Sequence, residues 1–489
     1  MKVAPVTPAR ALISALALLL AACGGDGSSP SVGGSGPPTG ATPTPTPSPT
    51  PAPSCSLRAQ QDVVSEILDE WYLFPNLLAT VNPDNFSTLQ SFIDARVAPA
   101  RAQGIDRFFS AATSIAQEDA LISSGASSGF GVRLSFDSAA GRLFVIEGYE
   151  GTPGFAAGLD RGTEILAIGT PGSALQTVAS LFASGGSQAV SNALGPSDPG
   201  VTRVLQFRPL GGAVIERSVT KTQFSLDPVS DRYGVLVLND GGRRVGYFNL
   251  RTFIVRDAER QMREAFGQFR DQGVTDLVID LRYNGGGLVS GADVLGDLLL
   301  AGRVGQLWSR TLVRAEKQAQ IDRERPPRTI GAEANAISPT RLAFITTGAS
   351  ASASELVING LLPYLGNNIA LIGSNTFGKP VGQFAFSVPS CDLRLRPVSF
   401  KTVNANGQGD YFNGLASVMP NTCRASDDIG FALGDPAEPS LRTALDFIAG
   451  RPCTPIVSRT GIMWHMEGAR DMLEARNPTA AQNEMPGFF

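Results

Sequence analysis

Apolar and polar residues alternate in blocks over residues 235–373, in the order strand, helix, strand, helix. Apolar runs that suit buried strands lie at residues 245–250, 277–281, 342–345 and 369–372. Apolar positions at helical spacing lie at residues 257–271, 292–300 and 356–365. Because strands that alternate with helices favour a largely parallel, covered sheet, the pattern predicts an α/β domain over residues 235–453.

The preceding residues divide into a helical region and a β-rich region. Residues 55–125 are predicted to be helical, since two stretches place apolar side chains at helical spacing, Val63 to Tyr72 and Leu89 to Val97. Residues 126–225 carry short alternating stretches that are typical of strands. Residues 454–489 form a polar tail without a clear period, for which the sequence predicts no function.

The first 54 residues predict export. Lys2 and Arg10 precede an apolar run at residues 11–22 that is too short to span a bilayer, as in a signal peptide at residues 1–22. The sequence Leu-Ala-Ala-Cys resembles the bacterial lipobox, which implies lipid on Cys23; a plain signal peptide is the alternative. Residues 23–54 are rich in Pro, Thr, Ser and Gly and form a linker. We expect a lipid-anchored protein on the periplasmic side of a bacterial membrane, with the outer membrane as the favoured site.

Four further cysteines favour disulfides in an exported chain. None has CxxC spacing, so a metal site is not expected, and the sequence calls for no cofactor. Four cysteines allow three connectivities, of which we expect Cys391–Cys423 and Cys55–Cys453 from their positions in the sequence. The net charge of −4 gives no basic footprint for nucleic acid.

Candidate chemistry lies in residues 341–383, where a serine-rich stretch joins a predicted strand to a predicted helix. A serine there sits beside the free amides of a helix N-terminus, which can hold an oxyanion. The one histidine, His465, lies in the polar tail, which disfavours a Ser-His-Asp arrangement. Only five of the 40 basic residues are lysines, and a buried lysine, unlike arginine, can act as a base near neutral pH. Lys379, between two predicted strands, suits that task.

The run Ser-Ala-Ser-Ala-Ser-Glu at 350–355, the later Phe-Gly-Lys and the glutamine after it resemble the C-terminal processing (tail-specific) peptidases of the S41 type. The resemblance implies a nucleophile at Ser352, a general base at Lys379 and an orienting residue at Gln383. It further implies an oxyanion hole formed by the amides of Ala353 and a glycine of 285–287, for which we choose Gly286. One departure is Pro380, where the family usually has glycine.

Residues 128–223 resemble a PDZ domain. The resemblance is carried by the opening Gly129, Phe130, Gly131 and Val132 and by the stretch Thr-Pro-Gly-Phe-Ala-Ala-Gly-Leu at 152–159. Amides of such a glycine-rich loop can hold a terminal carboxylate while the adjacent strand edge pairs with an extended peptide. These four residues are therefore the expected peptide-binding site. A structural β-domain without a ligand is the alternative.

Two other motifs are decoys. Residues 125–129 match G-x-S-x-G, but a helical pattern precedes them where a nucleophile elbow needs a strand. Ser218 and Lys221 match S-x-x-K in a stretch that alternates like a strand, which sends the two side chains to opposite faces. We expect both residues to be polar groups that face solvent.

The sequence thus predicts an α/β, multidomain protein with a helical N-terminal region, a β-rich PDZ-like domain and a crotonase/ClpP-like core. Its expected function is that of an exported serine endopeptidase that hydrolyses proteins recognised through their C-terminal tails. The expected partners are peptides with free C-termini, and the membrane through the lipid. The alternative is a non-catalytic PDZ-type lipoprotein scaffold, which Pro380 favours because it could shift the turn that aims Lys379.

Overall fold

The computed structural model describes residues 55–457, 470–476 and 478–489. The predicted signal peptide, the linker with Cys23 and the histidine His465 lie outside the described residues. Among the helices that are described, none has both the length and the apolar character needed to cross a membrane.

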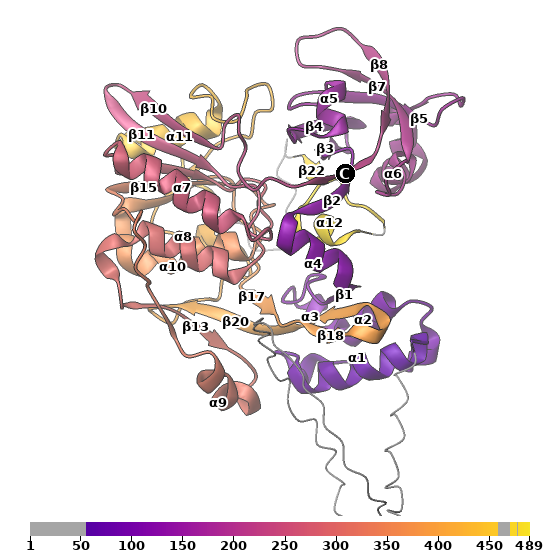
Figure 1. Cartoon of the computed structure of the whole chain (residues 1–489), viewed down its shortest axis with the longest axis horizontal. Coiled ribbons are helices and arrows are strands. Elements are labelled where there is room, and N and C mark those ends of the chain that lie inside the picture. Colours follow the sequence, from indigo (N-terminus) through magenta and orange to yellow (C-terminus); the bar gives the residue numbers. More distant parts are fainter. Residues whose placement is uncertain (1–54, 458–469, 477) are drawn as a thin grey trace, which may run out of the picture. The chain divides into compact units, whose positions relative to one another are not determined.

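A six-stranded sheet forms the centre of the region from residue 235 onward (Figure 1). Its order is β10-β11-β12-β15-β16-β21, and every neighbouring pair is parallel except β10 with β11. The strands are β10 (Val235–Asp240), β11 (Arg243–Asn249), β12 (Asp276–Asp280), β15 (Arg341–Thr346), β16 (Ile369–Gly373) and β21 (Thr422–Arg424). The four apolar runs of the sequence are β11, β12, β15 and β16, and the mixed α/β class that they predict is confirmed.

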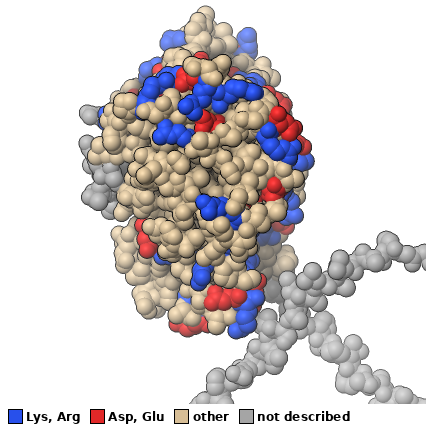
Figure 2. Space-filling view, turned by 90° about the vertical axis from the view of Figure 1, so that its left-hand side faces the viewer, with Lys and Arg blue, Asp and Glu red and all other residues tan. Residues whose placement is uncertain are grey.

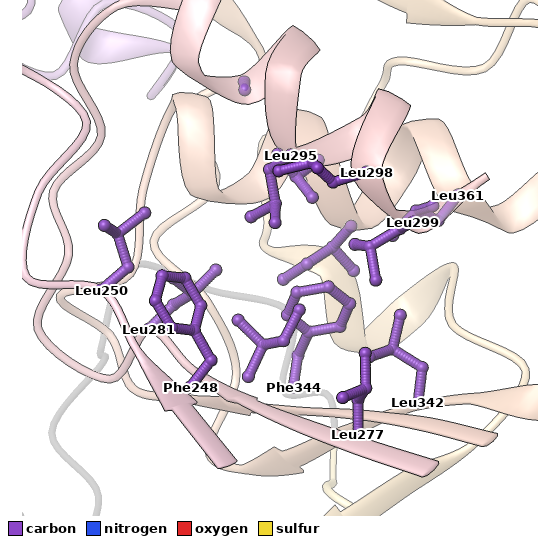
Figure 3. Packing of buried hydrophobic residues seen from close by; sticks show 14 of the residues in the cluster. Phe248, Leu250, Leu277, Leu281, Leu295, Leu298, Leu299, Leu342, Phe344 and Leu361 are labelled. Atoms are coloured by element: carbon purple, nitrogen blue, oxygen red, sulfur yellow. The ribbon is translucent and has the colours of Figure 1, made fainter. Parts of the chain in front are cut away.

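Helices cover both faces of this sheet, because alternate strand residues point to opposite sides. On one face, strand residues such as Leu277 and Phe344 point toward leucines of the overlying helices, including Leu298 and Leu361 (Figure 3). On the other face, Val278 and its neighbours pack against a single helix. The first face carries α7 (Ala258–Asp271), α8 (Val289–Leu299) and α10 (Ala353–Leu365), and the second carries α11 (Pro439–Ile448).

A second, four-stranded sheet of order β14-β13-β20-β17 lies beside helix α10, which contacts β20. Its members all pair antiparallel. It comprises β13 (Leu307–Leu312), β14 (Arg328–Thr329), β17 (Val381–Gln383) and β20 (Val398–Asn404), with α9 (Ala315–Glu324) between β13 and β14.

The N-terminal region is helical, as its pattern predicts, but it also shares a sheet with a distant hairpin. Strand β1 pairs antiparallel with β19, and β19 with β18, so that residues 111–114 lie beside residues 393–396. Apolar residues of the first helix, such as Val64 and Leu68, are buried with Leu395 of this hairpin. The elements are α1 (Leu57–Trp71), α2 (Leu89–Arg96), α3 (Ala98–Ala102), β1 (Ala111–Ser114), α4 (Ile115–Ser124), β18 (Phe386–Val388) and β19 (Leu393–Arg396).

The predicted disulfide connectivity is wrong. The structure pairs Cys55 with Cys391 and Cys423 with Cys453. Cys55 lies just before Ser56, the N-cap of α1, and Cys391 lies on the turn between β18 and β19, so the docking of that helix on the hairpin brings them together. Cys423 lies in β21, and the chain after α11 runs beside this strand, as the bond from the Arg424 amide to the Thr454 carbonyl shows.

Residues 126–225 form most of a β-rich domain whose sheet has the order β22-β3-β4-β5-β7-β8, with β6 added to β5. Helix α6 packs on this sheet and contributes Val190 and Leu194 to its buried cluster. The elements are β2 (Ala126–Gly129), β3 (Val132–Asp137), β4 (Arg142–Gly148), α5 (Pro153–Ala157), β5 (Glu164–Gly169), β6 (Gln176–Thr177), α6 (Val178–Leu194), β7 (Thr202–Arg208), β8 (Ile215–Thr220) and β9 (Thr222–Ser225).

The edge of this sheet is filled by parts of residues 471–476 and 478–489, which we call the tail segment. It contains β22 (Asp471–Met472) and α12 (Ala480–Glu484). Strand β22 pairs antiparallel with the end of β3, where Met472 lies opposite Ser135. The sequence predicts no structure for these residues.

Charged residues of both signs are interspersed on the face that Figure 2 presents, and much of that face is uncharged. Because opposite charges alternate there, this face carries no continuous field of one sign.

Candidate active site

Ser352 lies at the junction between strand β15 and helix α10, at the carboxyl end of a central parallel strand. It directly precedes the first residue of α10, Ala353. Its backbone has φ 56° and ψ −114°, a conformation that residues other than glycine rarely adopt. Residues held in such conformations cluster at functional sites, because the surrounding structure must enforce them. The predicted nucleophile therefore sits on a strained turn at a helix N-terminus.

Lys379 lies on the connection from β16 to β17, and Gln383 is the last residue of β17. Together with Ser352, both residues line one cavity of about 830 Å³. The Lys379 amine lies 5.0 Å from the centre of the Phe109 ring, which comes from the N-terminal region. The three residues that the resemblance picked out, which span 32 positions of the chain, thus share one cavity.

Burial lowers the pKa of Lys379, because removal from water disfavours the charged ammonium. Three carboxylates oppose this effect and raise the pKa; in order of strength they are those of Glu484, Asp106 and Glu355. Since desolvation dominates, the amine loses its proton more easily than an ordinary lysine. An amine with a lowered pKa is suited to act as a general base.

Glu355 joins the backbone of the nucleophile to the backbone of the base. Its carboxylate accepts hydrogen bonds from the amides of Ser352 at 3.0 Å, Gly378 at 2.7 Å and Lys379 at 2.7 Å. The side chain is fully buried, and this desolvation raises the pKa of its carboxyl group. The sequence interpretation missed Glu355, although a glutamate three residues after a serine at a helix start is the capping-box pattern.

Residues 284–287, which we call the glycine loop, lie against the turn that carries Ser352. Asn284 accepts hydrogen bonds on its carbonyl oxygen from the Ala351 amide and the Ser354 hydroxyl. Gly286 has a φ of 112°, and a Cβ there would come within 2.7 Å of the Ser352 Cβ, so a side chain does not fit at this position.

The predicted oxyanion donors lie at this junction. Ala353 is the first residue of α10, so its amide has no acceptor within the helix. The Gly286 amide lies beside Ser352 but donates to the Asn284 side chain at 2.9 Å, so it is engaged in this structure. Gly285 and Gly287 both line the cavity and are the neighbours that the sequence left open. The choice among these glycines stays a prediction.

Two residues of the N-terminal region also shape the site, and no motif signals them. The Arg107 guanidinium donates to the carbonyl oxygens of Phe377 at 2.6 Å and Gly378 at 2.7 Å, directly before Lys379. The Gln383 side-chain amide donates to the Phe109 carbonyl oxygen at 2.9 Å. Its predicted role in orienting Lys379 stays a prediction.

The strand that leads into the glycine loop ends in a buried ionic cluster. The Arg282 side chain is 1% exposed and pairs with Asp280 at 2.8 Å, Glu438 at 3.0 Å and Asp427 at 2.9 Å. Because a buried guanidinium must be paired, this cluster fixes the end of β12 relative to the segments after β21. It holds the loop that faces Ser352.

The predicted peptide-binding residues lie at the start of β3. The amides of Gly131 and Val132 both donate to the main-chain oxygen of Phe489, at 2.9 and 3.2 Å. Phe130 is buried in the domain core, and a Cβ on Gly129 would meet the carbonyl carbon of Phe489 at 2.7 Å. The structure thus brings all four residues to one place, and the chain's own Phe489 occupies it.

The second decoy holds a buried lysine rather than a solvent-facing one. The Lys221 amine donates to the carbonyl oxygens of Gly195 and Pro196, and burial lowers its pKa to about 7. The expectation that Lys221 faces solvent is wrong, because the chain that leaves α6 places the carbonyl oxygens of Gly195 and Pro196 next to its amine. Ser218 lies on β8, as the alternation predicts.

The part of the chain that carries this geometry matches a known family. Residues 244–415 match the model of peptidase family S41. This region of the chain is similar to peptidase family S41. Within residues 55–457, 470–476 and 478–489, no group of three His, Cys, Asp or Glu side chains is placed to hold a metal ion.

S41 relatives cover more of the chain than this domain. A carboxyl-terminal-processing protease of Picosynechococcus sp. is 26% identical over 330 residues, which is 66% of this chain and 71% of the relative. The carboxyl-terminal-processing peptidase 3 of Arabidopsis thaliana is 28% identical over 263 residues, 53% of this chain and 46% of the relative. The crystal structure of a putative S41 protease from Bacteroides fragilis, 23% identical, superposes with a TM-score of 0.59 over 79% of this chain and 97% of that chain, which shows a shared fold.

Proposed function

We propose that this chain is an exported serine endopeptidase that cleaves proteins through a dyad of Ser352 and Lys379. The observation that carries the proposal is the carboxylate of Glu355. It binds the amides of both residues, and so it fixes the hydroxyl-bearing and the amine-bearing segments relative to each other. Similarity to a peptidase family supplies the reaction class.

The residues perform the reaction in two halves. The neutral Lys379 amine takes the proton from the Ser352 hydroxyl, whose oxygen attacks the carbonyl carbon of the scissile bond. The amide of Ala353 and a glycine-loop amide hold the resulting oxyanion. The C–N bond then breaks, the Lys379 ammonium gives its proton to the leaving amine, and an ester on Ser352 remains. Water attacks this ester while Lys379 accepts its proton; the bond to the Ser352 oxygen then breaks, the Lys379 ammonium returns the proton to that oxygen, and the product leaves as a carboxylic acid.

We further propose that residues 126–225 bind the tails of substrate proteins at Gly129, Phe130, Gly131 and Val132. Adjacent amides at the start of an edge strand are the arrangement by which extended peptides are captured. Two of these amides already bind one peptide oxygen, which supports this assignment. Export, the lipid on Cys23 and a location on the periplasmic side of a membrane rest on residues 1–54 and are part of the proposal.

The scaffold alternative rests on Pro380, which could misplace Lys379. The preceding turn is held on both sides, because its amides bind Glu355 and its carbonyls bind Arg107. A proline nitrogen cannot donate a hydrogen bond. The Pro380 carbonyl oxygen still accepts one from the Thr402 amide, at 3.3 Å, which also holds this part of the chain. These contacts favour the enzyme over the scaffold.

The test is peptide cleavage by the purified chain without its lipid. Ser352→Ala and Lys379→Ala are each expected to abolish cleavage, while Lys401→Ala, which removes an amine paired with Asp410 on the surface, is the matched control and is expected to retain it. Circular dichroism should give the same spectrum for all three variants. Full activity in either dyad variant would contradict the proposal and favour the scaffold.

A further inference from the structure

The tail segment lies across both proposed sites of the same chain. At its end, Gly487, Phe488 and Phe489 run antiparallel to the start of β3. The Phe489 amide donates to the Val132 carbonyl at 2.9 Å, and the Leu134 amide donates to the Gly487 carbonyl at 2.7 Å. These ladder bonds are the ones that an added peptide strand makes with a sheet edge.

The last two side chains are anchors. Phe489 is 1% exposed and belongs to the same buried cluster as Val190 and Leu194 of α6. Phe488 is equally buried, with its ring 5.5 Å from that of Tyr149. Burial of two aromatic side chains is a large part of what an apolar peptide end can gain from such a groove.

Two parts of the tail segment meet β3 at one point, and the residues between them leave the sheet. The Leu473 amide donates to the Leu134 carbonyl, while the Leu134 amide donates to the Gly487 carbonyl, so residues 474–476 and 478–486 form an excursion from one edge strand. This excursion includes α12, and its members Glu474, Gln482, Asn483, Glu484 and Pro486 line the cavity that contains Ser352 and Lys379.

The excursion reaches the glycine loop that faces Ser352. A Cβ on Gly285 of the glycine loop would come within 2.4 Å of the Glu484 carbonyl oxygen, so main chain lies directly on main chain there. Glu484 is also the carboxylate that most strongly raises the pKa of Lys379, against the desolvation that lowers it. The Met485 side chain, which is fully buried with Ile254 and Leu121, fixes this arrangement.

We propose that the tail segment is an inhibitor of its own chain: residues 487–489 occupy the peptide-binding edge of β3 and thereby hold residues 480–486 in the cavity at Ser352. The inference rests on the proposed function. A substrate must displace Phe489 from the Gly131 and Val132 amides, so the substrates that open the site are polypeptides whose bound end carries large apolar side chains. Binding and activation are then a single event, because the two halves of the tail segment are continuous.

The test compares full-length chains that differ in one anchor. Phe489→Ala weakens the part of the tail segment that binds β3, and Met485→Ala weakens the part that lies in the cavity. The exposed Arg476→Ala is the matched control within the same segment. A fluorophosphonate probe reports access to Ser352, and a fluorescent peptide with the sequence of residues 480–489 reports access to β3. We expect each anchor variant to label about tenfold faster than the wild type, Phe489→Ala to bind the peptide more tightly, and Arg476→Ala to change neither.

Other outcomes overturn one claim at a time. Equal labelling of the wild type and both anchor variants would refute inhibition, and equal peptide binding would refute occupancy of β3. Removal of the tail segment from the wild type but not from Ser352→Ala, seen by mass spectrometry, would make it a substrate and not an inhibitor. An absence of labelling in every form would refute the dyad instead, whereas tighter peptide binding by Phe489→Ala would still establish that residues 487–489 occupy β3.

Discussion

Glu355 offers the sharpest perturbation of the proposed site, because it touches no substrate and yet fixes both members of the dyad. In Glu355→Ala, the amides of Ser352, Gly378 and Lys379 lose their acceptor. A hydrogen bond to a charged group contributes about 1.5–3 kcal/mol. The sum of three such hydrogen bonds overstates the loss of stability, since the buried carboxylate is itself desolvated and water can enter the space that it leaves. We expect a decrease of about 2–4 kcal/mol in the free energy of unfolding.

The effect on catalysis should be larger than the effect on stability. Removal of the carboxylate frees the two segments that it joins, and a misplacement of about 1 Å between reacting groups costs roughly a hundredfold in rate. We therefore expect kcat of Glu355→Ala to fall by about a hundredfold or more, and Glu355→Gln, which keeps one acceptor oxygen, to lie between this variant and the wild type. Peptide cleavage and urea denaturation measure the two quantities.

A variant in the hydrophobic core distinguishes the effect of misplaced catalytic groups from the effect of lower stability. Leu298 is fully buried between α8 and the central sheet (Figure 3), so Leu298→Ala should cost a similar free energy of about 2–5 kcal/mol. It should leave kcat within a few-fold of the wild type at a temperature at which both variants are folded. If Glu355→Ala is as destabilised as Leu298→Ala and equally active, the reasoning on the carboxylate is refuted.

Two further predictions concern ionisation and covalent structure. Folding lowers the pKa of Lys379. Between this lowered pKa and the usual value of about 10.4, the unfolded chain therefore binds more protons at Lys379 than the folded chain does. The contribution of Lys379 to the free energy of unfolding rises with pH over that window. Lys379→Met should therefore stabilise the fold most at pH values below the folded pKa and progressively less toward pH 10; urea denaturation across pH 6–10 checks this, and a gain that grows with pH would contradict it. Non-reducing peptide mapping should find Cys55 linked to Cys391 and Cys423 linked to Cys453, and removal of the first bridge by Cys55→Ser should cost about 2–4 kcal/mol; a Cys391–Cys423 peptide would contradict the fold.

The central sheet could be predicted from the sequence because its information is local. Each parallel strand buries both faces and so appears as an apolar run, and the helices between them carry a helical period. Ser352 and Lys379 follow such strands, so their meeting at one edge of the sheet is a consequence of its topology. The motif and the fold gave the same answer for these two residues.

The parts that sequence reasoning missed depend on contacts between distant segments. The hairpin at residues 386–396 leaves the catalytic region and joins β1, and no pattern in either stretch names its partner. The disulfides follow that docking, which is why positions in the sequence suggested a different pairing. The tail segment shows no regular period, since it is held by hydrogen bonds to β3 and by single buried side chains such as Met485 and Phe489.

The most direct measurement is the rate at which a fluorophosphonate labels Ser352 in Phe489→Ala and in Phe489→Ala with Lys379→Ala, followed by intact mass and peptide mapping from pH 6 to 10. The account predicts one adduct on Ser352, a rate that rises with pH through a pKa below that of ordinary lysine, and loss of labelling when the amine is removed. Labelling that does not depend on Lys379, or an adduct on another serine, would contradict it.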